Sequence, residues 1–146
     1  MPKNKLLTAV HLFLIKDNQI LMLRRFNTGY EDGNYSVVAG HVDPGESVSQ
    51  AMAREAMEEA GIIISPNSLE VVQVMNRKAQ DERIDFFLSA KAWKGEPRIM
   101  EKNKCDDLSW FDINLLPENT IPYIKKAIRN YQDRFFYCEF GWGRQG

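Results

Sequence analysis

The alternation of apolar and polar positions predicts a chain of short strands interrupted by two helices. Apolar and β-branched residues run from Leu6 to Ile15 and return from Ile20 to Leu23 after a polar turn, a pattern typical of a β-hairpin. The polar, glycine-containing segments 26–34 and 39–46 are predicted as loops. Further strands are predicted at 35–38, 69–76, 84–93 and 108–111.

The first helix is predicted to begin after Ser47, which can act as N-cap because Gln50 follows three residues later in a capping-box arrangement. Gly61 stands where a left-handed C-cap is wanted. A second helix is predicted from Thr120 or Ile121 to Tyr131, where apolar residues recur with helical spacing. This order of elements predicts an α+β fold in which helices pack on a mixed sheet.

Length and charge narrow the function classes. A chain of 146 residues with 44% apolar residues is the size of one domain, and we expect residues 1–146 to form a single one. Its 19 basic and 20 acidic residues give a net charge of −1. Domains that bind long nucleic acids usually carry a basic excess, so the balance argues against that class and leaves a small phosphorylated ligand open.

The two cysteines, Cys105 and Cys138, lie far apart and in no metal-ligand spacing. We interpret them as reduced thiols of a cytoplasmic protein. The sequence has no signal-peptide pattern, and no apolar stretch reaches the roughly 18 residues that a membrane span needs. We therefore expect a soluble, intracellular protein without a membrane partner.

Carboxylates gather on one side of the first predicted helix, where Glu55, Glu58 and Glu59 fall within an arc of roughly 100°. Such carboxylates repel one another, and the nearby helix C-terminus disfavours negative charge. A divalent cation such as Mg²⁺ would offset both effects, whereas a solvated acidic face is the simpler interpretation of the three residues alone. The opposite side is predicted to pack closely on a sheet through small residues, namely Ser49, Ala53, Ala56 and Ala60.

The residues around these carboxylates form a longer motif. The segment GHVDPGESVSQAMAREAMEEAGI, from Gly40 to Ile62, resembles the Nudix box at every spacing. One position departs from the family pattern, because Ala56 stands where a larger aliphatic residue is usual. The resemblance covers about residues 6–131, implies an α/β/α sandwich with a mixed sheet, and leaves the tail 132–146 unassigned.

The resemblance implies a role for each box residue. Glu55, Glu58 and Glu59 would bind Mg²⁺, with Mn²⁺ able to substitute, and the Gly40 carbonyl would complete the ligands. Glu46 and Arg54 would form an internal pair that holds the metal ligands in position.

A general base is implied as well, and the choice is left open. Glu55 is one candidate, and Glu101 lies about where many members place a glutamate after the box. Asp106 and Asp107 are further candidates in the same region.

Contacts to substrate are predicted outside the catalytic carboxylates. Arg24 and Arg25 end the second strand, and alternation allows only one of them to face a cleft. Ser36 matches a position that often touches the base in nucleotide-cleaving relatives, and His41 in the box loop can approach phosphate. His11, in contrast, is expected to be a packed or surface histidine.

The implied activity is hydrolysis of a nucleoside triphosphate to monophosphate and pyrophosphate, as in MutT-type members. Arg77 stands where ADP-ribose hydrolases tend to carry a proline. Hydrolysis of a nucleotide sugar or another nucleoside diphosphate derivative is the alternative, and a non-catalytic nucleotide-binding module is a third. The aromatic tail is predicted to complete the core or to cover a partner in a homodimer, through Phe135, Phe136, Tyr137, Phe140 and Trp142.

Overall fold

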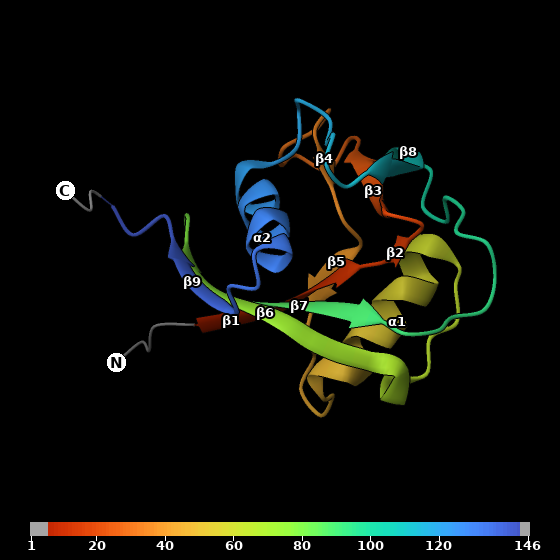
Figure 1. The fold of residues 1–146 in the computed structure, drawn as a ribbon, viewed down its shortest axis with the longest axis horizontal. Helices are drawn as coiled ribbons and strands as arrows, with labels where there is room; N and C mark the ends of the chain where they lie inside the picture. Colours follow the sequence, from red (N-terminus) through yellow and green to blue (C-terminus); the bar gives the residue numbers. More distant parts are fainter. Residues whose placement is uncertain (1–5, 144–146) are drawn as a thin grey trace.

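The computed structural model describes residues 6–143 and places two helices on opposite sides of a five-stranded sheet (Figure 1). The elements in chain order are β1 (Leu6–Phe13), β2 (Ile15–Lys16), β3 (Gln19–Arg25), β4 (Tyr35–Ser36), β5 (Ala39–His41), α1 (Val48–Ala60), a 3₁₀ turn (Pro66–Ser68), β6 (Leu69–Lys78), β7 (Glu82–Ala90), β8 (Cys105–Asp112), α2 (Pro122–Gln132) and β9 (Tyr137–Phe140). None of the helices within this described part is long and apolar enough to cross a bilayer.

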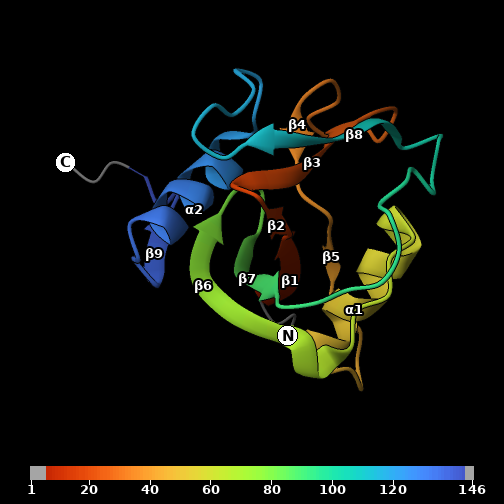
Figure 2. The same cartoon turned by 45° about the vertical axis from the view of Figure 1, so that its right-hand side comes forward.

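The five-stranded sheet has the order β5-β1-β7-β6-β9 and is mixed, since β1 runs parallel to β7 and β9 parallel to β6. A second sheet joins β3 to β2, β4 and β8. Figure 2 shows β1, β7 and β6 between α2 on the left and α1 on the right. This is the predicted α+β class with helices on both faces of a mixed sheet.

Strand alternation divides the core between the two helices. Val10 and Leu12 of β1 pack with the buried face of α1, whereas Phe13 packs with α2. The two sides of β7 follow the same rule, because Leu88 belongs to the α1 cluster and Phe87 to the α2 cluster. The two faces of one sheet therefore carry separate apolar layers.

The predicted hairpin between 6–15 and 20–23 is wrong in its extent. Only β2 pairs with β3 as a hairpin, whereas β1 lies in the five-stranded sheet between β5 and β7. The chain changes sheets at Leu14, whose carbonyl accepts a hydrogen bond from Leu21 N at 3.0 Å. A continuous apolar run did not reveal this crossing, because residues on both sides of it are buried.

Several further predicted bounds need correction. Strand β4 ends at Ser36, β7 ends at Ala90 and β8 already begins at Cys105. Segment 39–46 is not all loop, since β5 pairs antiparallel with β1 along its first three residues. The polar stretch 77–83 mostly continues β6 and β7, which pair from Leu69↔Ala90 to Lys78↔Glu82. The tail adds a strand, β9, that sequence analysis missed.

Candidate active site

Helix α1 is positioned by the caps that the sequence predicted. The Ser47 side chain accepts a hydrogen bond from Gln50 N, and the Gln50 side chain accepts one from Ser47 N. At the other end Gly61 adopts φ 68° and donates to the Met57 carbonyl. Both ends are therefore satisfied locally, and the helix begins and ends at defined residues.

The buried side of α1 is rotated relative to the predicted stripe of small residues. Ala56 and Ala60 are fully buried as expected, but Ser49 and Ala53 are only half-buried. The remaining buried positions are Ala51 and Met52. A small residue at position 56 allows close contact between the helix and the sheet, which agrees with the close-packing interpretation of this departure from the box pattern.

Glu55 and Glu59 lie against the backbone of β5. A Cβ placed on Gly40 would be 2.1 Å from the Glu55 carboxyl carbon, so the glycine makes room for this carboxylate. Glu59 accepts a hydrogen bond from Ala39 N at 3.3 Å. Gly40 and two of the three helix carboxylates are thus brought together across 15 or more positions of sequence.

Burial dominates the electrostatics of this pair. Burial, and after it the neighbouring Glu55 carboxylate, raise the pKa of Glu59 to about 8. Burial also raises the pKa of Glu55, although the Arg54 guanidinium opposes that shift. Two buried carboxylates in contact favour a shared proton or a cation, because both cannot stay charged without one.

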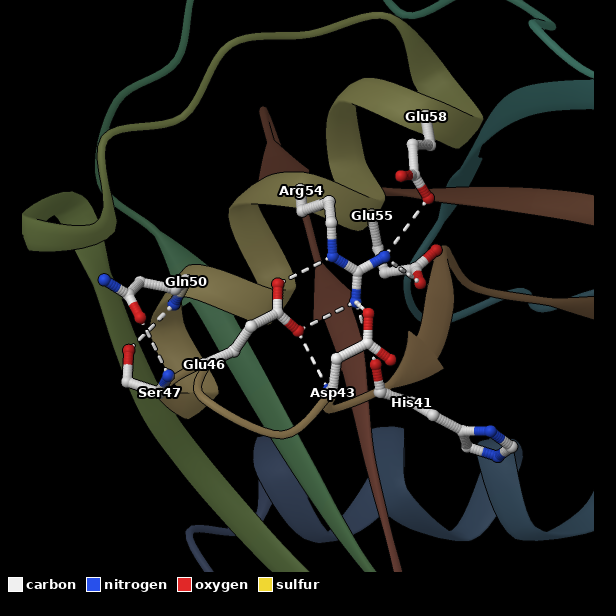
Figure 3. A network of polar contacts seen from close by, with 8 residues as sticks. All are labelled: His41, Asp43, Glu46, Ser47, Gln50, Arg54, Glu55 and Glu58. Atoms are coloured by element: carbon white, nitrogen blue, oxygen red, sulfur yellow. Dashed lines mark hydrogen bonds and ion pairs between the residues drawn. The ribbon is translucent and has the colours of Figure 1, made fainter.

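Arg54 is the centre of the polar network around the box loop (Figure 3). Its Nε and Nη2 donate to both Glu46 oxygens at 2.7 and 3.0 Å, and Nη2 also donates to the His41 carbonyl at 3.0 Å. Its Nη1 donates to Glu55 at 2.9 Å and to Glu58 at 3.2 Å. Hydrogen bonds from Arg54 lower the pKa of Glu46 to about 2, so this carboxylate stays ionised.

Glu58 occupies a different environment from the other two carboxylates. Its side chain is half exposed and lies on the Arg54 side of the helix (Figure 3). Within residues 6–143, no three His, Cys, Asp or Glu side chains converge as a ready-made metal cluster. The Glu55–Glu59 pair still fits Mg²⁺, which commonly takes one or two protein carboxylates and completes its shell with water and substrate phosphate.

A hollow of about 380 Å³, which we call the Glu101 hollow, opens beside Glu59. Glu101 and Lys104 line it from the loop before β8. Arg25 lines it from the end of β3, and Thr28 from the loop that follows. The fold therefore brings Glu101 to the same hollow as Glu59, although no sequence spacing relates the two.

Arg24 and Arg25 face different surroundings, as strand alternation requires. Arg24 donates from Nε to Asp106 at 2.7 Å and lines neither of the two hollows described here. Arg25 lines both hollows and donates to the Tyr30 carbonyl and the Thr28 hydroxyl, which holds the 26–34 loop in place.

The second hollow, also about 380 Å³, lies on the α2 side of the five-stranded sheet. We call it the Arg77 hollow; Ala39, Gly40 and His41 of β5 line one wall, and the His41 imidazole points away from the Arg54 network (Figure 3). Ser36 is buried, with 4% of its surface exposed, and lines neither hollow.

Sequence analysis missed a buried polar cluster at this second hollow. His11 is packed, as expected, and its Nε2 lies 3.1 Å from the Tyr123 hydroxyl. Arg77 donates from Nε to Asp85 at 2.6 Å, and both residues are buried. Burial lowers the pKa of His11 to about 4, despite the nearby Asp85 carboxylate. The only available signal was an unusual density of charged residues at the ends of two strands.

An α/β/α sandwich with a loop–helix that holds carboxylates against a glycine defines a class of phosphate-processing hydrolases. The NUDIX domain model matches residues 5–131, so the chain belongs to the Nudix family. It is therefore a hydrolase that acts on pyrophosphate bonds.

Relatives with assigned names differ in what they act on. An ADP-ribose pyrophosphatase of Methanocaldococcus jannaschii is 31% identical, over 84% of this chain and 71% of its own. An 8-oxo-dGTP diphosphatase of Escherichia coli is 27% identical, over 86% and 98%. The chain also matches an NAD-capped RNA hydrolase of Stutzerimonas stutzeri, of whose length it spans only 39%.

Solved structures agree with this assignment. A MutT NUDIX hydrolase from Burkholderia pseudomallei superposes with a TM-score of 0.79 at 25% identity, covering 86% of this chain and 98% of that one. A NUDIX hydrolase from Nitrosomonas europaea, 21% identical, shares the fold with a TM-score of 0.76 over 91% of this chain and 93% of its own.

Proposed function

We propose that this chain hydrolyses a nucleoside triphosphate to a nucleoside monophosphate and pyrophosphate. The observation that best supports the proposal is Arg25, which lines the Glu101 hollow and the Arg77 hollow together. A nucleotide bound across the two would place its phosphates beside Glu59 and its nucleoside between β5 and α2. The relative from Escherichia coli, named for an activity on 8-oxo-dGTP, supports a triphosphate substrate.

The metal proposed for this site is Mg²⁺, with Mn²⁺ able to substitute. Glu55, Glu58 and Glu59 would hold it, together with the Gly40 carbonyl. Held there, the ion would neutralise charge on the phosphates and would lower the pKa of the attacking water.

The chain's own residues orient the reactants and move the proton. Arg54 and Glu46 keep Glu55 in place through charge-assisted hydrogen bonds. A water molecule adds to the α- or β-phosphorus. The anhydride bond between the α- and β-phosphates breaks, and the nucleoside monophosphate and pyrophosphate separate. A carboxylate takes the proton from the water. We propose Glu101 for this last role because it shares the hollow with Glu59.

Of the four residues predicted to contact substrate, two line a hollow and two do not. Arg25 is the basic residue at both hollows, and His41 is exposed at the rim of one. Both are proposed to contact phosphate. Arg24 pairs with Asp106 and Ser36 is buried, and neither lines a hollow, so their contact with the substrate stays a prediction from the sequence.

A product assay tests the proposal. The protein is incubated with nucleoside triphosphates, nucleotide sugars and ADP-ribose, each with Mg²⁺ and with EDTA, and products are separated by chromatography. Glu55→Gln removes one proposed ligand charge, and Glu70→Gln is the matched control because Glu70 lies exposed on β6, away from both hollows. Release of monophosphate and pyrophosphate that needs Mg²⁺ and Glu55, but not Glu70, is expected.

Hydrolysis of a nucleoside diphosphate derivative is the second candidate. The relative named an ADP-ribose pyrophosphatase, 31% identical over 84% of this chain, favours it. Turnover of ADP-ribose alone in the same assay would keep the chemistry and replace the substrate. Binding of nucleotides with no turnover of any would instead support the non-catalytic module.

Cellular context and assembly complete the proposal. We propose a cytoplasmic protein that acts on small nucleotides and neither binds long nucleic acids nor associates with membranes. A homodimer is proposed through the aromatic tail, where Phe135, Phe136 and Tyr137 each expose more than half of their surface at 61%, 55% and 53%.

A further inference from the structure

Arg77 is an unusual residue to find at the floor of a ligand-sized hollow, because only 4% of its surface is exposed. Its position is set from two sides. Nε donates to the buried Asp85 at 2.6 Å, and the guanidinium carbon lies 3.6 Å from the centre of the Tyr123 ring. Tyr123 is held in turn by His11, whose Nε2 is 3.1 Å from the hydroxyl. The guanidinium plane is therefore fixed before any ligand arrives.

The remaining edge of this guanidinium is available to a ligand. Among the described residues, no hydrogen-bond partner exists for Nη1 or Nη2 of Arg77, which together carry four N–H groups. Neither Nη atom is among the fully buried polar atoms that lack a partner, so both face the hollow, where a ligand with two neighbouring acceptors would pair with them.

Charge pairing in the hollow favours a neutral ligand end. The charge of Arg77 is balanced by Asp85, and that of Arg83 by Asp81 at 2.9 Å. A phosphate or carboxylate beside Arg77 would therefore meet guanidinium groups that already have anionic partners. Arg25, which lines the same hollow, instead donates to the Tyr30 carbonyl and the Thr28 hydroxyl rather than to a carboxylate, and suits the phosphate end of the ligand. The Tyr30 ring, which is 48% exposed, lines the same hollow and suits a planar, uncharged group.

We propose that Arg77 selects a 6-oxopurine base, guanine or hypoxanthine, through two hydrogen bonds from its Nη groups to O6 and N7. The proposal rests on the proposed function and names the base that this function takes. Among the purines, only a 6-oxopurine presents two adjacent acceptors, O6 and N7, on one edge. Cytosine is the pyrimidine with two adjacent acceptors, N3 and O2, so binding of CMP as tight as that of GMP would overturn the selection. Adenine places its N6 amino donor against the Arg77 donors. 8-Oxoguanine carries a hydrogen on N7 and loses one acceptor, so the unoxidised base is the preferred ligand.

Binding of monophosphates by isothermal titration calorimetry tests this selection without requiring turnover. GMP and IMP, which share O6 and N7, are expected to bind within about twofold of each other. AMP and 7-deaza-GMP, which keeps O6 but lacks the N7 acceptor, are expected to bind roughly tenfold to a hundredfold more weakly. 8-Oxo-GMP should bind as weakly as AMP and 7-deaza-GMP.

A variant separates Arg77 from the rest of the hollow. Arg77→Lys keeps a cation for Asp85 but removes the paired donors, and should bring GMP binding down to the level of AMP. Arg129→Lys is the matched control, because Arg129 donates to the Ile113 carbonyl from α2 and lines neither hollow. Circular dichroism and thermal unfolding report whether each variant is folded.

The nucleotide series on the unaltered protein decides the outcome even if the Arg77 variant does not fold. Equal binding of GMP and 7-deaza-GMP, tighter binding of AMP, or binding of no monophosphate would each overturn the proposal. Selective GMP binding without hydrolysis of GTP would leave it standing and defeat the proposed function. Hydrolysis of all purine triphosphates at one rate with equal binding would do the reverse.

Discussion

A Cβ on Gly40 would lie 2.1 Å from the carboxyl carbon of Glu55, so this glycine and this carboxylate occupy adjoining space that no larger residue could share. The obstructing atoms belong to the end of a flexible side chain rather than to backbone. A methyl group at position 40 would therefore turn the Glu55 carboxylate aside and leave the fold of β5 and α1 largely intact.

We expect Gly40→Ala to lower kcat about a hundredfold, because a displacement of about 1 Å is enough for such a loss in a positioned site. Thermal unfolding should shift by only a few degrees. Steady-state kinetics measures the loss of kcat, and calorimetric unfolding of the same preparation measures the shift in unfolding temperature. A variant with normal kcat would show that the close approach of Gly40 and Glu55 has no part in catalysis.

The Arg54–Glu46 pair should act as one positioning unit. Arg54→Lys loses the fork that spans both Glu46 oxygens, and Glu46→Gln loses the charge that the fork requires. Each is expected to reduce kcat roughly tenfold to a hundredfold and to raise the Mg²⁺ concentration needed for half-maximal activity.

A double-mutant cycle distinguishes this unit from two independent residues. If Arg54 and Glu46 act together, the double variant should be little worse than either single variant. Losses that multiply would show that the two side chains support the site separately.

Local signals explain why the catalytic helix could be predicted. Ser47, Gln50 and Gly61 act within a few residues of where they stand, so sequence spacing alone gave the helix bounds. The pattern from Gly40 to Ile62 likewise encodes its own loop and helix. The face of the helix that packs on the sheet was harder to predict. The helix is rotated so that Ala51 and Met52 are buried in the core in place of Ser49 and Ala53.

Long-range pairings account for what could not be predicted. Arg77 and Asp85 meet because β6 and β7 pair in one particular register. That register could not be predicted from the sequence alone. Glu101 reaches the hollow of Glu59 through a loop whose path depends on both sheets. Strand β5 was missed since Ala39-Gly40-His41 has little strand propensity and is ordered by pairing with β1.

The buried histidine predicts how stability depends on pH. The pKa of His11 is about 4 in the folded protein and 6.5 ordinarily, mainly because of burial, although Asp85 opposes the shift and Arg77 adds to it. The unfolded chain therefore takes up the proton first. The neutral, buried His11 contributes fully to the free energy of unfolding above pH 6.5. This contribution, about 3 kcal/mol, is lost as the pH falls toward 4.

Urea unfolding between pH 4 and 7.5 measures this contribution when the protein is compared with His11→Gln, which keeps a polar side chain near Tyr123 and does not titrate. The two free energies of unfolding should converge as the pH falls from 6.5. Carboxylates titrate in both proteins and cancel in the difference. Curves that stay parallel throughout would contradict a neutral, buried His11.

The tail offers the last test, because its residues divide between two roles. Cys138 and Phe140 pack against the α2 cluster, and β9 covers the edge of β6 by parallel pairing. Ending the chain at Asp133 would expose that edge and remove these contacts, so we expect a lower unfolding temperature and aggregation.

Point variants separate this structural role from assembly. Phe136 is 55% exposed, so Phe136→Ser should leave unfolding nearly unchanged. If its ring covers a second copy, the same variant should shift the mass measured by light scattering after size exclusion from dimer to monomer. Phe140→Ser, in contrast, should destabilise the fold whatever the assembly, because Phe140 packs on the core. A monomer in both the unaltered protein and Phe136→Ser would leave the tail with its structural role alone.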